Sequence, residues 1–276
     1  MTQNKSLILL RGGGDLASGV ALRLHHAGLQ LVISELEQPL AVRRTVSFAE
    51  AVYEGKHTVE GVTARLVNRE QLQATFDAGE IPVLTDPDVA ILAALPFLIV
   101  IDARLTKQTP SPLPVDVPLH IGLGPGFHAG SDCHAVIETR RSHTLGRVYW
   151  EGTTQADSGL PEGDRRRVLR APQEGVFTAY KKIGEHVETG DVIAVLQNET
   201  FRFATSDMKV VSEISGVLRG VLRDGLHVTK GLKIGDVDPR DDREACYLVS
   251  DKALSIGGGV LEAILARREI RKELWM

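Results

Sequence analysis

The stretch Leu7–Glu35, LILLRGGGDLASGVALRLHHAGLQLVISE, decides the fold predicted for the first half of the chain. Its opening apolar run, 7–10, is typical of a parallel strand buried on both faces. The turn that follows fits the pattern G-x-G-x-x-A at Gly12, Gly14 and Ala17. A helical pattern, a second apolar run and an acid, Glu35, come next. This order predicts the first β-turn-α-β unit of a Rossmann-like domain that binds a dinucleotide.

Three charged residues of this unit have predicted roles. Glu35 lies where an acid accepts the ribose hydroxyls, so a bound nicotinamide dinucleotide would be NAD rather than NADP. Asp15 has two interpretations: it caps the helix, or it binds a hydroxyl or amine of a ligand, with Arg11 as countercharge. A carboxylate at this helix end opposes a phosphate, so we expect a selective ligand site rather than a general pyrophosphate site.

Strands and helices continue to alternate along the chain. We expect helices over 69–78 and 88–95, and strands over 81–84, 97–101 and 135–137. Such alternation predicts a doubly wound parallel sheet, with ligands bound beyond the carboxyl ends of the strands. The residues predicted to meet at that edge are Gly12–Asp15, Glu35, Asp86 and Asp102–Lys107.

Two further segments are candidates for binding an anion. Arg43 and Arg44 follow the second strand, and either clamp a ligand or are surface charges. The glycine-rich stretch 121–130 includes Gly124, Gly126 and Phe127, and its turns expose backbone amides.

The polar residues after this stretch invite a metal hypothesis. Asp132, His134 and His143 offer oxygen and nitrogen ligands, but their spacing matches no established metal motif. We therefore assign no metal residue. The sequence also leaves the catalytic residues unassigned.

The second half contains an internal repeat. Residues 174–196 match residues 215–237, so that Gly175 corresponds to Gly216 and Gly190 to Gly231. Two such copies, each with short strands and glycine turns, predict a small β-barrel. The pattern resembles the biotinyl/lipoyl barrel-sandwich hybrid. Lys209 lies between the copies, but not at the tip of a symmetric hairpin, so no covalent biotin or lipoate is expected. A carrier modified at Lys209 is a third, non-enzymatic hypothesis.

These patterns define the predicted organisation. A Rossmann-like nucleotide-binding domain covers 1–152, a linker 153–167 and the inserted barrel 168–240. A strand over 245–249 and a helix over 260–271 return to the first domain within 241–276. Gly257, Gly258 and Gly259 precede this helix, either as a tight turn or as a second anion site.

Composition excludes several classes of partner. The chain has 276 residues, 43% of them hydrophobic, and a net charge of -4. This acidic balance argues against a nucleic-acid or anionic membrane surface. The apolar run near the N-terminus is too short for a signal peptide, and two distant cysteines indicate no disulfide framework. We therefore expect a cytoplasmic protein, and the sequence leaves a homo-oligomer open.

Several blocks, in order, resemble one known family, the YqeB-type proteins of the selenium-dependent molybdenum hydroxylase system. The blocks include GGGDLASGVALRLHHAG (12–28), GLGPGFHAG (122–130), HAVIETRRSHTLGRVYWEG (134–152) and SDKALSIGGGVLEAI (250–264). The resemblance implies an accessory protein for the maturation of these hydroxylases. It supplies no catalytic residues for transfer to this chain.

Two functions follow as expectations. The first is a maturation factor that binds a nucleotide-bearing ligand, such as a dinucleotide form of the molybdenum cofactor, and presents it to a molybdenum hydroxylase apo-enzyme or to other maturation proteins. The alternative is an NAD-dependent oxidoreductase, which rests on Gly12, Gly14, Ala17 and Glu35.

Overall fold

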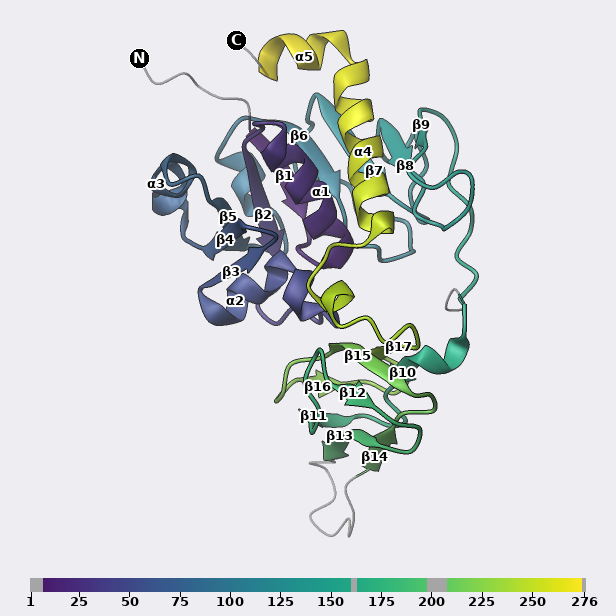
Figure 1. Cartoon of the computed structure of the whole chain (residues 1–276). Coiled ribbons are helices and arrows are strands. Elements are labelled where there is room, and N and C mark those ends of the chain that lie inside the picture. Colours follow the sequence, from purple (N-terminus) through teal and green to yellow (C-terminus); the bar gives the residue numbers. More distant parts are fainter. Residues whose placement is uncertain (1–6, 160–162, 198–207, 275–276) are drawn as a thin grey trace. The chain divides into compact units, whose positions relative to one another are not determined.

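The structure, a computed structural model, describes residues 7–159, 163–197 and 208–274. The chain divides into two compact units. Unit 1 comprises Met1–Pro39, Ser47–Ser158 and Val249–Met276, and unit 2 comprises Leu40–Val46 and Gly159–Leu248 (Figure 1). Unit 2 therefore takes a short segment from the first half of the chain in addition to the second half.

A nine-stranded sheet forms the centre of unit 1. Its order is β3-β4-β5-β2-β1-β6-β7-β8-β9. The seven strands between the two edges, β4-β5-β2-β1-β6-β7-β8, run parallel to one another. The strands are β1 (Leu7–Arg11), β2 (Leu31–Glu35), β3 (Lys56–Val59), β4 (Val62–Leu66), β5 (Ile81–Thr85), β6 (Phe97–Asp102), β7 (Leu119–Leu123), β8 (Ala135–Ile137) and β9 (Val148–Tyr149).

The prediction of a Rossmann-like doubly wound parallel sheet is wrong, because the sheet is mixed. Edge strand β3 pairs antiparallel with β4, and edge strand β9 pairs antiparallel with β8. The β3–β4 hairpin turns at Glu60 and Gly61, whose φ angles of 45° and 83° suit a two-residue turn. Residues 103–118 join the parallel strands β6 and β7 without a helix. The period of apolar residues predicted β1, β2, β5, β6 and β8, but neither the inner strands β4 and β7 nor these connections.

Helices cover the sheet of unit 1. Helix α1 (Asp15–His26) and helix α4 (Asp251–Ala266) pack together on one face (Figure 1). The predicted helix 88–95 is only a short 3-10 turn. The remaining elements are η2 (Phe48–Glu50), α2 (Ala51–Glu54), η3 (Arg69–Gln71), α3 (Leu72–Asp77), η4 (Ala90–Ala93) and α5 (Arg268–Leu274).

The three consecutive glycines lie inside α4, so neither a tight turn nor a second anion site is formed there. A Cβ on Gly259 would lie 2.1 Å from the carbonyl oxygen of Gly146, and one on Gly257 would lie 2.9 Å from that of Gly19. Gly258 faces open space. The glycines thus allow close packing of α4 on two sides. The predicted strand 245–249 is also wrong, since η6 (Glu244–Cys246) lies there.

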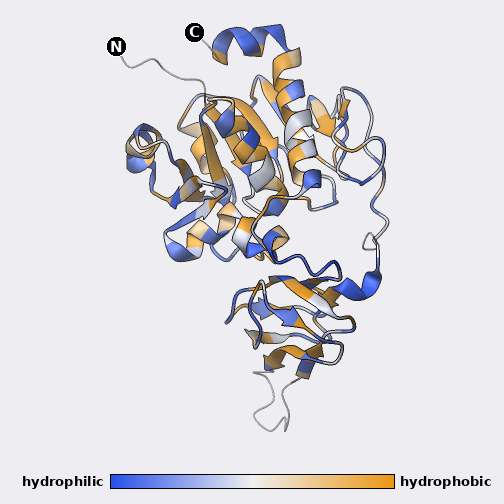
Figure 2. Cartoon of the chain, in the orientation of Figure 1, coloured by the Kyte–Doolittle hydropathy of each residue, from blue (hydrophilic) through white to orange (hydrophobic). Residues whose placement is uncertain are grey.

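Apolar side chains fill both faces of the central sheet. On the face away from α1, Leu9, Val32 and Val100 join Leu84 and Ile91 in one buried cluster. Figure 2 shows the inner strands coloured as hydrophobic and α5 mostly as hydrophilic. Burial on both faces explains why these strands read as continuous apolar runs.

Unit 2 contains two four-stranded antiparallel sheets, of order β10-β17-β15-β12 and β14-β13-β11-β16. Its elements are η1 (Arg44–Val46), η5 (Arg165–Arg167), β10 (Val168–Arg170), β11 (Gly175–Ala179), β12 (His186–Val187), β13 (Val192–Gln197), β14 (Met208–Val211), β15 (Gly216–Val221), β16 (His227–Val228) and β17 (Lys233–Asp238).

The prediction of a biotinyl/lipoyl-like barrel is wrong, because the strands form two separate sheets rather than one closed barrel. The repeat nevertheless has a structural basis, because a short strand of each copy pairs with a longer strand of the other copy. Strand β12 of the first copy pairs with β15, and β16 of the second copy pairs with β11. The two sheets enclose an apolar core that includes Phe177 and Leu218. Lys209 lies within β14, paired with Val195.

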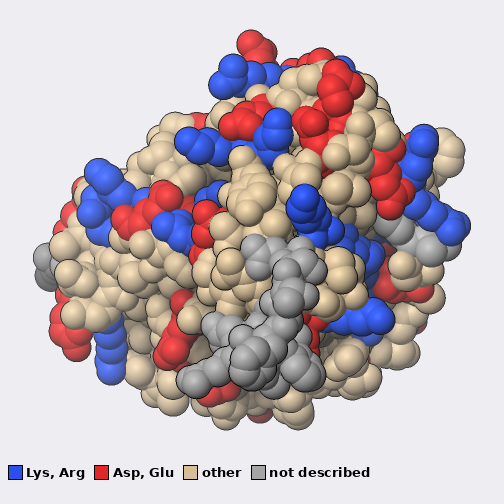
Figure 3. Space-filling view, turned by 90° about the horizontal axis from the view of Figure 1, so that it is seen from below, with Lys and Arg blue, Asp and Glu red and all other residues tan. Residues whose placement is uncertain are grey.

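Two buried aspartates of β17 anchor a network of charges in unit 2. Asp236 accepts from Arg167, Arg219 and Lys233 at 2.9, 3.0 and 2.6 Å. Hydrogen bonds from Arg240 lower the pKa of Asp238 to about 2. On the face shown in Figure 3, basic side chains likewise lie beside acidic ones. A buried carboxylate needs such partners to remain ionised.

We predict opposite effects of alanine at neighbouring glycines of α4. Gly258→Ala should stabilise unit 1 by about 0.5–1 kcal/mol, because alanine favours the helix and finds open space. Gly259→Ala should destabilise it by about 1–3 kcal/mol or more, because the new methyl group meets the Gly146 carbonyl. Chemical denaturation monitored by circular dichroism measures both changes. Equal effects of the two substitutions would contradict the close packing described here.

Candidate functional site

The carboxyl ends of the parallel strands meet at one edge of the unit 1 sheet. Arg11, Asp102 and Gly122 end β1, β6 and β7 side by side, since Arg11 pairs with Asp102 and Asp102 with Gly122. Glu35 and Thr85 are likewise paired at the ends of β2 and β5. In open sheets with parallel strands this edge is the usual place for ligands.

The glycine turn at this edge is closed by Glu35. The Gly13 N–H donates to Glu35 Oε2 at 2.6 Å, and the Leu36 N–H donates to Oε1 at 2.8 Å. Burial raises the pKa of Glu35, while these two hydrogen bonds oppose the rise. The carboxylate that the sequence assigned to ribose hydroxyls therefore holds the backbone of the turn.

The rest of the turn is also fixed. Gly12 has a φ of 94°, and a Cβ there would meet the carbonyl oxygen of Ala103 at 3.4 Å. The Ala49 N–H donates to the Gly13 carbonyl at 2.8 Å. Gly14 is the N-cap of α1 and Asp15 its first residue, so Asp15 is not the predicted cap. Ala17 is buried within α1.

A buried carboxylate links the ends of β1 and β6. Asp102, which is 1% exposed, binds Arg11 at 3.0 Å and Arg104 at 2.6 Å. Burial lowers the pKa of Arg11, and Asp102 counteracts this shift. Arg11 was predicted as countercharge for a ligand, but its guanidinium serves a protein carboxylate, while its buried Nε has no partner among the described residues.

His120 adds a neutral polar group beneath the same edge. It pairs with Val100 in the sheet, two residues before the Asp102–Gly122 pair, so it shares their face. Burial lowers the pKa of His120 to about 4. Its Nε2 is buried and has no partner among the residues that the structure describes. Sequence reasoning missed His120, although a histidine within an apolar strand is a visible signal.

The glycine-rich loop folds back over β7. Phe127 packs on Gly122, where a Cβ would lie 2.3 Å from the ring, and its ring meets that of His120 edge to face. Gly124 and Gly126 have φ angles of 74° and 108° and lie against Thr139 and Gln108. These predicted ligand residues thus shape a packed loop.

The three candidate metal ligands each have a different hydrogen-bond partner within the protein. Asp132 accepts from the His128 N–H at 2.8 Å, and His134 Nδ1 accepts from the His120 N–H at 2.9 Å. The His143 carbonyl accepts from Arg147. Within residues 7–159, 163–197 and 208–274, no group of three or more His, Cys, Asp or Glu residues is suited to hold a metal ion.

Arg43 and Arg44 lie in the segment that belongs to unit 2. Arg43 Nη2 donates to the carbonyls of Ala245 and Leu248, both at 3.0 Å. Arg44 Nε donates to the carbonyl of Val221 at 2.9 Å. Both side chains attach their segment to the rest of unit 2.

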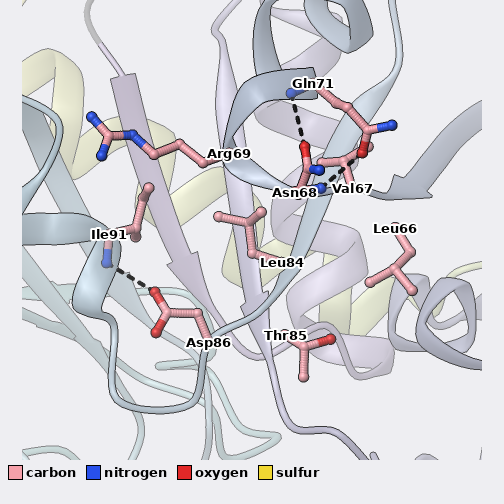
Figure 4. A pocket seen from close by; sticks show the side chains of 9 residues that line it. All are labelled: Leu66, Val67, Asn68, Arg69, Gln71, Leu84, Thr85, Asp86 and Ile91. Atoms are coloured by element: carbon pink, nitrogen blue, oxygen red, sulfur yellow. Dashed lines mark hydrogen bonds between the residues drawn. The ribbon is translucent and has the colours of Figure 1, made fainter.

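A pocket of about 580 Å³ opens at the carboxyl ends of β4 and β5 (Figure 4). Its apolar lining is Leu66, Val67, Leu84 and Ile91. Its polar lining is Asn68, Arg69, Gln71, Thr85 and Asp86. Both strands belong to the parallel part of the sheet, so the pocket lies at the predicted ligand edge.

Two short turns hold the polar residues of the pocket. Asn68 Oδ1 accepts from the Gln71 N–H, and Gln71 Oε1 accepts from the Asn68 N–H, which forms a capping box at η3. The carboxylate of Asp86 accepts from the N–H groups of Ala90 and Ile91, both at 2.9 Å. Sequence reasoning named Asp86 but missed Asn68, Arg69 and Gln71. The spacing N-x-x-Q directly after a strand is typical of a capping box and could have indicated these residues.

We predict that His120 contributes to acid sensitivity. Its folded pKa of about 4 lies below the ordinary 6.5, so the stability it supplies is present above pH 6.5 and is lost as the pH falls toward 4. The free energy of unfolding of the wild type should fall by about 2–3 kcal/mol more than that of His120→Gln over this range. Urea titrations at several pH values measure this difference, and His143→Gln, in an exposed loop, is the control. Parallel pH profiles of wild type and His120→Gln would refute the prediction.

Comparison with solved structures gives matches at low TM-scores. A succinylglutamate desuccinylase/aspartoacylase from Rhodobacter sphaeroides is 14% identical, with 84% of this chain and 85% of that chain covered and a TM-score of 0.31. The apo ectoine utilization protein EutE (DoeB) from Ruegeria pomeroyi is 11% identical, with 84% and 86% covered and a TM-score of 0.29.

Both functional expectations are corrected. Neither structure is named as a maturation accessory protein or as an NAD-dependent oxidoreductase. Within the chain, Glu35 binds the backbone of the turn rather than facing a ribose site, which removes the main residue argument for NAD. The two predicted functions and the Rossmann-like nucleotide-binding assignment are therefore wrong. The low TM-scores transfer no activity to this chain.

Comparison of the sequence with other proteins supports a coarser relationship. No family model matches. The uncharacterized protein YqeB of Escherichia coli (strain K12) is 46% identical over 265 residues, which are 94% of this chain and 47% of YqeB. The chain thus spans about half the length of this curated relative. The match does not show the link to selenium-dependent molybdenum hydroxylases, but it supports a YqeB-type family for this chain.

Proposed function

We propose that unit 1 binds a small molecule in the pocket at the carboxyl ends of β4 and β5. The observation that carries this proposal is the pocket itself, whose volume of about 580 Å³ is within the usual range for ligand sites. Its position supports the proposal, because ligands of open sheets with parallel strands bind beyond the carboxyl ends of the strands.

The lining suits a ligand with an apolar body. Val67, Leu84 and Ile91 are 7–8% exposed and belong to the core cluster on this face of the sheet. They form a rigid surface whose remaining exposed area a ligand would cover. Burial of apolar area stabilises a complex by about 25 cal/mol per Å² before the costs of association.

Polar groups at the mouth suit orientation of the ligand. Asn68, Arg69 and Gln71 are exposed, and so is Thr85 at the end of β5. The capping box fixes Asn68 and Gln71 relative to the apolar lining. A few fixed polar groups around an apolar surface are the usual basis of specificity in small-molecule sites.

Other expectations from the sequence stay predictions and form no part of this proposal. They are NAD or a molybdenum cofactor dinucleotide as cofactor, the lack of covalent biotin or lipoate, the expected protein partners and a cytoplasmic location. No helix in the described part of the chain combines the length and the apolarity needed to cross a bilayer.

We predict that Thr85→Trp weakens ligand binding by unit 1. Thr85 is exposed at the pocket mouth, so an indole there would occupy part of the pocket without replacing a core side chain. Fragments that bind the wild type in saturation-transfer NMR should bind the variant about tenfold more weakly or worse, because the steric conflict costs about 1–3 kcal/mol.

The matched control is Thr58→Trp, which places the same indole on an exposed position of β3, outside the pocket. It should retain wild-type fragment binding. The proposal fails if the wild type binds no fragment of a diverse library, or if both tryptophan variants bind as the wild type does.

A further inference from the structure

We infer that the pocket of unit 1 selects ligands that carry an anionic, hydrogen-bond-accepting group such as a carboxylate. This inference rests on the proposed function and adds the chemical class of the ligand. It depends on which hydrogen-bonding groups of the pocket mouth are already used within the protein and which remain available (Figure 4).

The capping box fixes which terminal atoms of two amide side chains are donors. Asn68 Oδ1 and Gln71 Oε1 accept from backbone N–H groups at 3.2 and 2.9 Å. An amide oxygen that accepts a backbone N–H identifies the other terminal atom as nitrogen, with two N–H donors. Neither NH2 group has a recorded partner in the described part of the chain. Asn68 and Gln71 therefore offer donors to a ligand.

Arg69 adds a cation with spare donors. Its Nη2 donates to the Ala94 carbonyl at 3.1 Å. A guanidinium has five N–H donors, so most of them stay available. The bond to Ala94 restrains the guanidinium beside the pocket, and a restrained fork of donors suits a carboxylate.

The acidic residue of the pocket, Asp86, does not reverse this preference. Both of its oxygens accept backbone N–H groups, those of Ala90 and Ile91. Burial lowers the pKa of Arg11 on balance, and the charge of Asp86 opposes this shift only weakly, so Arg11 offsets a small part of that charge. Each Asp86 oxygen keeps a second lone pair, so acceptors remain at the mouth, but the amide donors of Asn68 and Gln71 and the guanidinium donors of Arg69 outnumber them.

The test compares three probes with the same phenyl body: phenylacetate, phenylacetamide and 2-phenylethylamine. Dissociation constants come from NMR chemical-shift titrations of the full chain. Phenylacetate should bind about fivefold more tightly than the amide, since an exposed charge-assisted contact is worth about 1 kcal/mol, and the amine should bind most weakly.

Arg69→Gln should remove the advantage of phenylacetate over phenylacetamide and leave the affinity for the amide unchanged. The matched control is Arg147→Gln, because Arg147 is also exposed and also donates to one carbonyl, that of His143. It should keep the preference for phenylacetate. High salt should reduce the preference of the wild type for the same electrostatic reason.

The outcomes separate the inference from the proposed function. If the three probes bind equally, or the amine binds best, and Thr85→Trp blocks them, the pocket binds ligands but the inference is wrong. If no probe binds the wild type, or Thr85→Trp leaves binding intact, the proposed function fails and the inference fails with it. Loss of amide binding in Arg69→Gln would also overturn the inference, because it would show a structural rather than an electrostatic role.

Discussion

The buried carboxylate of Asp102 is the constraint on which the ligand edge of unit 1 depends. It ends β6 and binds Arg11 at the end of β1 and Arg104 in the following loop. A buried carboxylate without cations would be costly, so these three residues fix one another. Gly12 can then lie directly on the Ala103 carbonyl, and the glycine turn is set against the end of β6.

A second carboxylate completes the same edge by a different route. Glu35 accepts two backbone N–H groups instead of binding cations, and its pKa is raised by burial. Both acids at these strand ends therefore serve the protein itself. The exposed and uncommitted groups lie farther along the edge, around β4 and β5, where the pocket opens. The candidate site is thus displaced from the glycine turn toward Arg69 and Thr85.

The sequence predicted strands such as 7–10 and 97–101, because burial on both faces leaves continuous apolar runs. It missed β7, whose end lies in the glycine-rich stretch that was interpreted as a turn. It could not predict the roles of charged residues. Arg43 and Arg44 read as a clamp beside the second strand, yet their partners are carbonyls some 180–200 residues later. The glycines 257–259 read as a turn, because packing against Gly19 and Gly146 compensates for their low helix propensity only in the folded protein.

The same distance along the chain constrains how unit 1 assembles during synthesis. The glycine face of α1 is covered by α4, which the ribosome makes more than two hundred residues later, after all of unit 2. Until residues 251–266 emerge, the surface of α1 at Gly19 is not covered by α4. The apolar side chains of the unit 1 sheet that α4 would cover remain exposed to water. Contacts between residues that are far apart in the sequence form slowly, and until they form the nascent chain exposes apolar surface. Three strand pairs of unit 2 join strands that lie close together in the sequence, and the segment 40–46 is synthesised before all of them, so unit 2 has no such delay.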